Sequence, residues 1–288
     1  MFEDVLVPTD GSECAEVAVS HARDLATRYG ATVHVLCVAD ARIVENAPHN
    51  EQIMEERTEL AERTCAGIAD DGVPVQRAVR SAVPHTAILK YVASHGIDLV
   101  VMGTHGRTGV ERYLLGSVTE KVVRLSDVPV LTVKAADGES VTYPYETVLV
   151  PTDGSPGASA AVGPAVDVAR TYGARLHALS VVDTMALGLD VRSEVIRDRL
   201  EESARSALAD VEERATAASL AGVETALEYG SPYKGIRSYV EATDVDLVVM
   251  GTHGRSGIDR YLLGSVAEKT VRTSPVPVMT VREPTEQG

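Results

Sequence analysis

The 288-residue chain has no tryptophan, one phenylalanine and only three cysteines. Because aromatic residues make up just 4% of the chain, its hydrophobic cores must be built mainly from aliphatic side chains. The cysteines, Cys14, Cys37 and Cys65, all lie in the first half and lack metal-like spacing. This pattern favours a reducing compartment over a disulfide framework.

Long apolar runs and basic residues are also scarce. No run reaches the roughly 18 residues that a membrane helix needs, and the opening MFEDVLVPTDGS is acidic, unlike a signal peptide. Lys and Arg number 27 against 42 Asp and Glu, so the net charge is -15. Such a surface repels nucleic acid and anionic membranes. We therefore expect a cytoplasmic protein that binds neither nucleic acid nor membranes. Its acidity is either an adaptation to a salty cytoplasm or that of an ordinary acidic protein.

What the chain does contain is a large internal repeat. VMGTHGRTGVERYLLGSV at 101–118 returns as VMGTHGRSGIDRYLLGSV at 249–266. FEDVLVPTDGS at 2–12 returns as YETVLVPTDGS at 145–155. The repeat predicts two duplicated domains, 1–136 and 144–288, joined by a polar linker at 137–143.

Within each copy, short Val- and Leu-rich runs alternate with helical patterns. In the first copy we expect strands at 4–8, 32–39, 73–79, 99–102 and 128–133, and helices at 13–29, 50–70, 84–95 and 118–125. Runs such as DLVVM are apolar on both faces, which is typical of a parallel strand covered by helices on both sides. The pattern predicts the α/β class: two tandem doubly wound, Rossmann-like domains, each with a five-stranded parallel sheet.

The longest repeated segment follows a strand and leads into a helix. Its glycines and serine are Gly103, Gly106, Gly116 and Ser117 in the first copy, and Gly251, Gly254, Gly264 and Ser265 in the second. Glycine lets backbone N–H groups approach a ligand closely. SVTE at 117–120 and SVAE at 265–268 match capping boxes, which predicts a serine-capped helix whose N-terminus attracts anions. A phosphate-binding loop and an ordinary α/β turn are the two interpretations.

The motif VPTDGS ends the first strand of each copy, at 7–12 and 150–155. It places Asp10 and Asp153 at the carboxyl edge of the expected sheet, where ligands of such folds bind. A carboxylate there can accept two hydrogen bonds from a ribose diol. The alternative is that each aspartate only forms an Asx turn before the next helix.

Together these motifs resemble the ATP-binding branch of the universal stress protein family, over almost the whole chain and twice. Gly-x-x-Gly, nine residues and then Gly-Ser is the signature of that branch, and PTDGS matches its first-strand motif. The resemblance implies the strand order 3-2-1-4-5 and a nucleotide site where the first and fourth strands end. One departure is Ala82-Val-Pro84, where the second copy keeps the family's Gly-x-Pro at Gly230-Ser-Pro232.

The resemblance also implies the residues that hold ATP, with any Mg²⁺ bound through the phosphates. In the first copy they are Pro8, Thr9, Asp10, Val38, Met102, Gly103, Gly106, Arg107, Gly116, Ser117 and Val118. In the second copy they are Pro151, Thr152, Asp153, Val181, Met250, Gly251, Gly254, Arg255, Gly264, Ser265 and Val266. The aspartates would hold the ribose, Pro8 and Thr9 would flank the base, and Val38 and Val181 would meet adenine. The glycines, serines, Val118 and Val266 would hold the phosphates.

Family members with one domain pair through their fifth strands. The resemblance therefore implies an internal pseudo-dimer of the two halves about a pseudo-twofold; independent domains or a homodimer are the alternatives.

Walker A, kinase and catalytic-triad motifs are all missing from the chain. The expected function is thus ATP binding in a stress-response or signalling protein, not an enzyme, whose nucleotide state regulates an unidentified protein partner. A weak ATP hydrolase using His105 or His253, and a non-binding assembly scaffold, are the alternatives.

Overall fold

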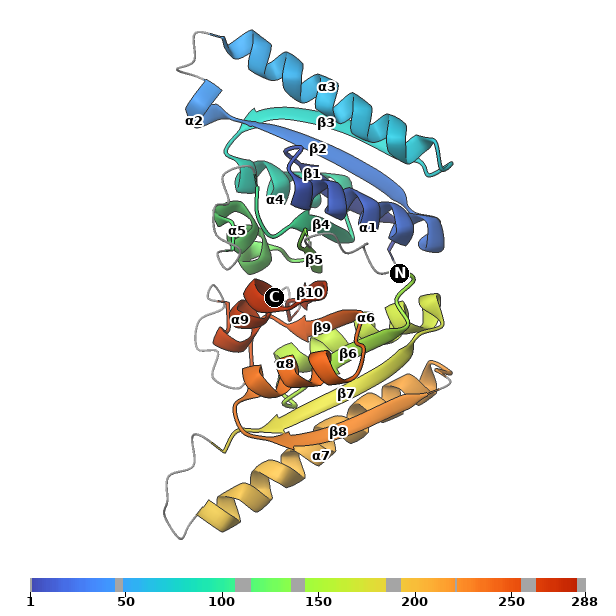
Figure 1. The fold of residues 1–288 in the computed structure, drawn as a ribbon, viewed down its shortest axis with the longest axis vertical. Helices are drawn as coiled ribbons and strands as arrows, with labels where there is room; N and C mark the ends of the chain where they lie inside the picture. Colours follow the sequence, from blue (N-terminus) through green and yellow to red (C-terminus); the bar gives the residue numbers. More distant parts are fainter. Residues whose placement is uncertain are drawn as a thin grey trace. The chain divides into compact units, whose positions relative to one another are not determined.

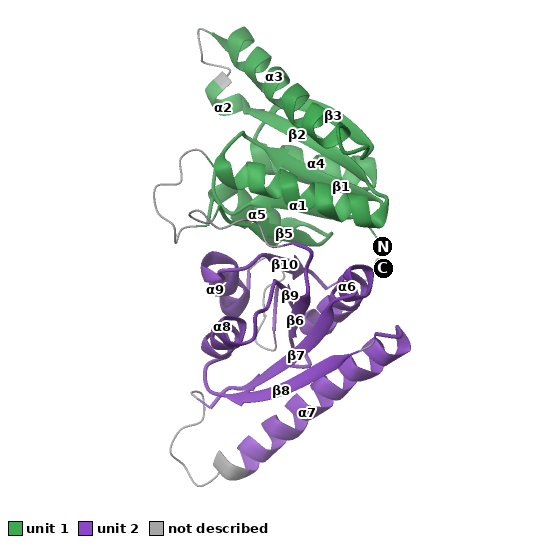
Figure 2. Cartoon of the chain, turned by 45° about the vertical axis from the view of Figure 1, so that its right-hand side comes forward, with its two compact units in different colours: residues 1–141 green, residues 142–288 purple. Residues whose placement is uncertain are grey.

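The computed structural model describes residues 2–44, 49–106, 115–135, 143–184, 193–220, 222–254 and 263–283. The chain divides into unit 1, residues 1–141, and unit 2, residues 142–288 (Figure 2). No helix within the described ranges is long and apolar enough to cross a membrane.

Unit 1 alternates strands and helices along the chain (Figure 1). Its elements are β1 (Asp4–Thr9), α1 (Glu13–Tyr29), β2 (Thr32–Asp40), α2 (Ala41–Val44), α3 (Asn50–Ala69), β3 (Val75–Ala82), α4 (Pro84–His95), β4 (Leu99–Gly103), α5 (Ser117–Leu125) and β5 (Val130–Val133). The strands pair in parallel in the order β3-β2-β1-β4-β5. Helix α1 packs on β1 and β4, α3 packs on β2 and β3, and α4 packs on α5.

Unit 2 repeats this arrangement. Its elements are β6 (Thr147–Pro151), α6 (Pro156–Tyr172), β7 (Arg175–Val182), α7 (Ser193–Ala217), β8 (Val223–Tyr229), α8 (Pro232–Ala242), β9 (Leu247–Gly251), α9 (Ser265–Thr273) and β10 (Val278–Val281). Its strands pair in parallel in the order β10-β9-β6-β7-β8. The predicted α/β class with a parallel sheet, built twice, is confirmed.

Local sequence explains how the first helix of each unit begins and ends. The Ser12 hydroxyl accepts a hydrogen bond from the Ala15 N–H, which caps α1, and Ser155 caps α6 in the same way. Gly30 and Gly173 end these helices with φ of 68° and 66°, a left-handed conformation that glycine adopts readily. The repeated boundaries of α1 and α6 thus follow from matching cap residues.

Two strands and one helix of unit 1 differ from the prediction by more than one residue. Strand β3 spans Val75–Ala82 because its ladder with β2 runs from Val33↔Val75 to Asp40↔Ala82. Strand β5 starts at Val130, later than predicted, because the Ser126 hydroxyl both accepts from the Val128 N–H and donates to its carbonyl, which holds a turn there. The short helix α2 was not predicted. Strand pairing and local turns, rather than residue preference, set these limits.

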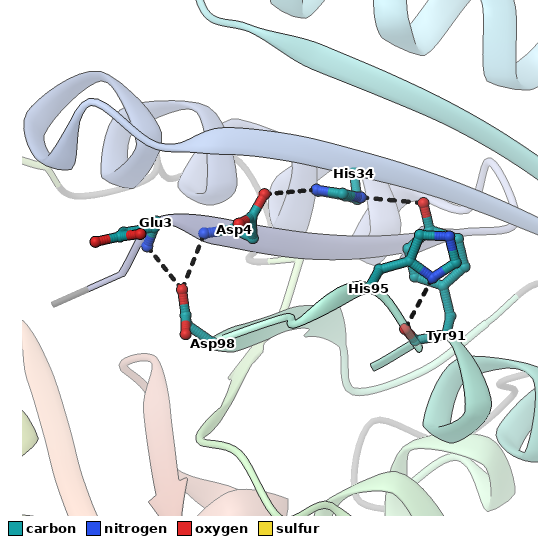
Figure 3. Close-up of polar contacts among 6 residues, drawn as sticks. All are labelled: Glu3, Asp4, His34, Tyr91, His95 and Asp98. Atoms are coloured by element: carbon teal, nitrogen blue, oxygen red, sulfur yellow. Dashed lines mark hydrogen bonds and ion pairs between the residues drawn. The ribbon is translucent and has the colours of Figure 1, made fainter. Parts of the chain in front are cut away.

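A buried polar network holds together the amino ends of the strands in unit 1 (Figure 3). The His34 ring, only 2% exposed, lies 2.8 Å from Asp4 Oδ1 through Nε2 and 3.0 Å from the Tyr91 hydroxyl through Nδ1. Asp98 Oδ2 accepts hydrogen bonds from the Glu3 and Asp4 N–H groups. Because Asp4 begins β1, this network lies at the edge of the sheet opposite the carboxyl ends.

Candidate functional site

Both repeated motifs end at one edge of the sheet. Strands β1 and β4 pair directly, with Val5 opposite Leu99, and end at Thr9 and Gly103. The chain continues from β1 toward β2 on one side and from β4 toward β5 on the other. The strand order therefore reverses between β1 and β4, which is where doubly wound sheets bind ligands. Strands β6 and β9 form the same pair in unit 2.

The Asp10 carboxylate lies beside Gly106 although the two residues are far apart in sequence. Its Oδ1 accepts a hydrogen bond of 3.0 Å from the Ser12 N–H. Its Oδ2 would lie only 2.6 Å from a Cβ built on Gly106. One oxygen thus forms the Asx turn and the other faces the glycine loop, while the contact with a ribose stays a prediction.

Unit 2 repeats this contact. Asp153 Oδ1 accepts hydrogen bonds from the Ser155 N–H at 3.0 Å and from the Ser155 hydroxyl at 2.6 Å. Its Oδ2 would lie 2.8 Å from a Cβ on Gly254. The same carboxylate and the same glycine therefore meet in both units.

The glycines that end β4 and β9 have a packing role. A Cβ on Gly103 would lie 2.7 Å from Cys14 Cβ and 2.8 Å from the Cys14 carbonyl carbon. A Cβ on Gly251 would lie 2.3 Å from the Gly157 carbonyl oxygen. The first helix of each unit thus packs directly on these strand ends, which explains the glycines by itself. Their contact with phosphate stays a prediction.

The predicted capping boxes are wrong. Helix α5 begins at Ser117 with Gly116 in the N-cap position, and α9 begins at Ser265 after Gly264; neither has a side-chain cap hydrogen bond among the described residues. The glycine occupies the cap because the Gly116 N–H donates to the Thr104 carbonyl at 2.8 Å while its own carbonyl accepts from the Glu120 N–H at 2.9 Å. The exposed Ser117 therefore sits inside the first turn.

The remaining predicted site residues lie at the same edge. Pro8 and Pro151 lie in the first strand of their units, Thr9 and Thr152 follow them and are buried, and Met102 and Met250 are buried near the ends of β4 and β9. Val38 and Val181 are half-buried near the ends of β2 and β7, and Val118 and Val266 are half-buried in the first turns of α5 and α9. Arg107 and Arg255 lie outside the described residues.

Sequence reasoning missed two side chains at this edge. The half-buried Arg57 on α3 donates from Nη1 to the Asp10 carbonyl at 3.2 Å. Thr119 on α5 donates from Oγ1 to the Gly103 carbonyl at 2.8 Å and ties the helix to the strand end. Thr119 follows the repeated segment directly and is replaced by Ala267 in the second copy, so the repeat does not mark it. No motif marks Arg57, because only the packing of α3 brings it to the loop.

The histidines of the loops make local contacts. His105 Nδ1 lies 2.9 Å from Thr104 Oγ1, and His253 Nδ1 lies 2.9 Å from Thr252 Oγ1. Each ring therefore bonds to the residue before it. This geometry fits a role in holding the turn.

Comparison with known proteins gives consistent matches. A family model described as universal stress protein family matches residues 1–134 and again 144–282. A universal stress protein of Methanocaldococcus jannaschii is 33% identical over 155 residues, covering 46% of this chain and 96% of its own. One of Mycobacterium tuberculosis is 33% identical over 195 residues, covering 66% of this chain and 63% of its own. The crystal structure of one from Archaeoglobus fulgidus covers 97% of this chain and 98% of its own, at 25% identity and a TM-score of 0.73.

Proposed function

Because this chain belongs to the universal stress protein family, whose model matches it twice, we propose that each unit binds an adenine nucleotide, ATP in the first instance. The observation that carries the proposal is the meeting of Asp10 Oδ2 with Gly106, repeated by Asp153 Oδ2 and Gly254. An ordinary turn would need the aspartate, but it would not need a glycine in the loop that follows the neighbouring strand.

The chemistry of this edge suits a nucleotide. A carboxylate that faces the loop can accept hydrogen bonds from ribose hydroxyls. Behind the loop, α5 starts with no capping side chain among the described residues, so its first N–H groups and positive dipole end suit phosphate. The polyphosphate itself would carry Mg²⁺, since such ions often bind through substrate phosphates with few protein ligands. Loss of the predicted serine caps therefore favours the phosphate interpretation.

The proposed role is binding, with the nucleotide state regulating a protein partner. Dedicated turnover needs a positioned base or a water-orienting group. The imidazoles of His105 and His253 instead contact their neighbouring threonines through Nδ1. We therefore propose hydrolysis that is slow at most. The pairing of the fifth strands, a homodimer and a cytoplasmic location stay predictions from the sequence.

The decisive experiment identifies the ligand that the protein carries. Protein purified without added nucleotide is denatured, and the released small molecules are measured by mass spectrometry. Calorimetric titration with ATP follows on protein stripped of ligand. We expect adenine nucleotide at about one per unit, or saturable ATP binding. No released nucleotide together with no binding heat would refute the proposal and favour a scaffold.

A further inference from the structure

An open cleft of about 680 Å³ lies next to the candidate site of unit 2. One wall is the loop that carries Asp153, which contributes Thr152 and Gly154; the opposite wall is α7, which contributes Arg199 and Ser206 among others. All of these residues belong to unit 2. The volume falls within the roughly 300–1,000 Å³ of small-molecule sites. The cleft is therefore large enough for a ligand group of its own.

Three further lining residues of the cleft, Ser159, Asp210 and Arg214, contact one another. Arg214 Nε pairs with Asp210 Oδ2 at 3.0 Å, and Arg214 Nη1 donates to the Ser159 carbonyl at 3.3 Å. The contact with Ser159 joins α7 to α6, whereas the pair with Asp210 lies within α7. These groups are therefore held by contacts within unit 2.

Two charged side chains of the α7 wall have no partner among the described residues. Arg199 and Glu202 lie three residues apart and so on one face of the helix, with Ser203 and Ser206 beside them. Neither the Arg199 guanidinium nor the Glu202 carboxylate hydrogen-bonds or pairs with another described residue. A guanidinium binds phosphate with two parallel hydrogen bonds, and carboxylates and hydroxyls match sugar hydroxyls. The chemistry of the wall suits a phosphorylated ribose.

Unit 1 differs at the corresponding loop. There the long Arg57 side chain reaches from α3 to the Asp10 carbonyl, at 3.2 Å. In unit 2 the residues of α7 that line the cleft opposite Thr152 and Gly154 include the small Ser203, Ser206 and Ala207. An arginine thus crosses the space beside the loop in unit 1, whereas small side chains leave it open in unit 2.

We propose that unit 2 accepts a dinucleotide, with one nucleoside half at Asp153 and Gly254 and the phosphorylated ribose of the other half in the cleft. In unit 1, where the Arg57 side chain reaches the loop, we expect a mononucleotide in the same orientation and no second half beside it. The inference rests on the proposed function, because the first half needs the nucleotide site.

The test separates the two units within the full chain. Gly106→Asp crowds a second carboxylate against Asp10 Oδ2 in the nucleotide site of unit 1, so that only unit 2 is measured; Gly254→Asp does the converse at Asp153. Each variant is titrated by calorimetry with ATP and with diadenosine tetraphosphate. In Gly106→Asp we expect the dinucleotide to bind roughly tenfold more tightly than ATP, because a charged group and several hydroxyls gain partners. In Gly254→Asp we expect no such preference.

A second pair of variants tests the cleft itself in the Gly106→Asp chain. Arg199→Ala with Ser206→Trp removes the cation and fills the space, and should abolish the dinucleotide preference while leaving ATP affinity and the melting temperature unchanged. Arg205→Ala is the matched control, because it removes an exposed α7 arginine that pairs with Glu201 outside the cleft.

Three outcomes would overturn the inference. The first is an equal preference for the dinucleotide over ATP in both units. The second is a preference in unit 2 that survives filling of the cleft. The third is a filled cleft that no longer binds ATP, which would place the mononucleotide in the cleft. Each leaves ATP binding, and so the proposed function, standing. If no variant or wild-type chain binds ATP or the dinucleotide, both proposals fall.

Discussion

Replacing Gly106 by alanine is expected to weaken nucleotide binding at unit 1 without destabilising it. The new Cβ would lie 2.6 Å from Asp10 Oδ2, about 0.8 Å short of the 3.4 Å at which ordinary contact begins. No positive φ requires glycine at this position. Because the contact is with the end of a flexible side chain, the carboxylate moves and the backbone stays.

The displaced carboxylate no longer meets the ribose in the expected geometry. Hydrogen bonds to a charged group contribute about 1.5–3 kcal/mol, which corresponds to a roughly ten- to hundredfold loss of affinity. The measurement is calorimetric titration with ATP of Gly106→Ala in the Gly254→Asp chain, in which only unit 1 binds. A thermal melt of the same protein should match that of its parent.

Gly103→Ala is the matched control, because it adds the same methyl group a few residues earlier. Its Cβ would lie 2.8 Å from the Cys14 carbonyl carbon, so α1 must shift away from β4. Overpacking of this kind typically costs about 1–3 kcal/mol, and the melting temperature should fall. If Gly106→Ala keeps full ATP affinity, or melts as early as Gly103→Ala, the carboxylate does not act as we infer.

Three further results are expected. Asp10→Ala and Asp153→Ala should each weaken one site roughly ten- to hundredfold, and an unchanged ATP titration of the double variant would remove these carboxylates from the sites. Ser12→Ala should lower the unfolding free energy measured in urea by about 1 kcal/mol, because it removes a helix cap. Ser117→Ala should lower it little, since Gly116 holds the cap position of its helix. Equal losses in the two variants would contradict this assignment. Burial lowers the pKa of His21 from 6.5 to about 4. Between these values the folded state binds fewer protons than the unfolded state, so stability falls as the pH is lowered. About 2 kcal/mol of the stability present above pH 6.5 should be lost by pH 5. His21→Leu should remove that part of the pH dependence. Urea unfolding at several pH values tests this, and a variant whose unfolding free energy falls with pH as steeply as that of the wild type would refute it.

The sequence by itself determined the class of fold and the duplication. Runs such as LVV at 99–101 are apolar on both faces, and all three of those residues are fully buried in β4. Serine and glycine marked the two ends of α1 and of α6 at matching places. These features are local, so residue order alone carries them.

The tertiary structure alone decided what the motif residues do. Asp10 and Gly106 meet only because β1 and β4 are neighbours in the sheet. Gly103 is required by helix packing, and Gly116 takes the cap position because its N–H is already bonded to Thr104.

The difference between the two units is likewise invisible in the repeated motifs, which are nearly identical. Arg57 reaches the loop of unit 1 from α3, while small residues of α7 leave a cleft in unit 2. These helices lie in the least similar part of the two copies and carry no motif. Which of their side chains meets the loop depends on how each helix packs against the sheet, a long-range property that a pattern of neighbouring residues does not encode.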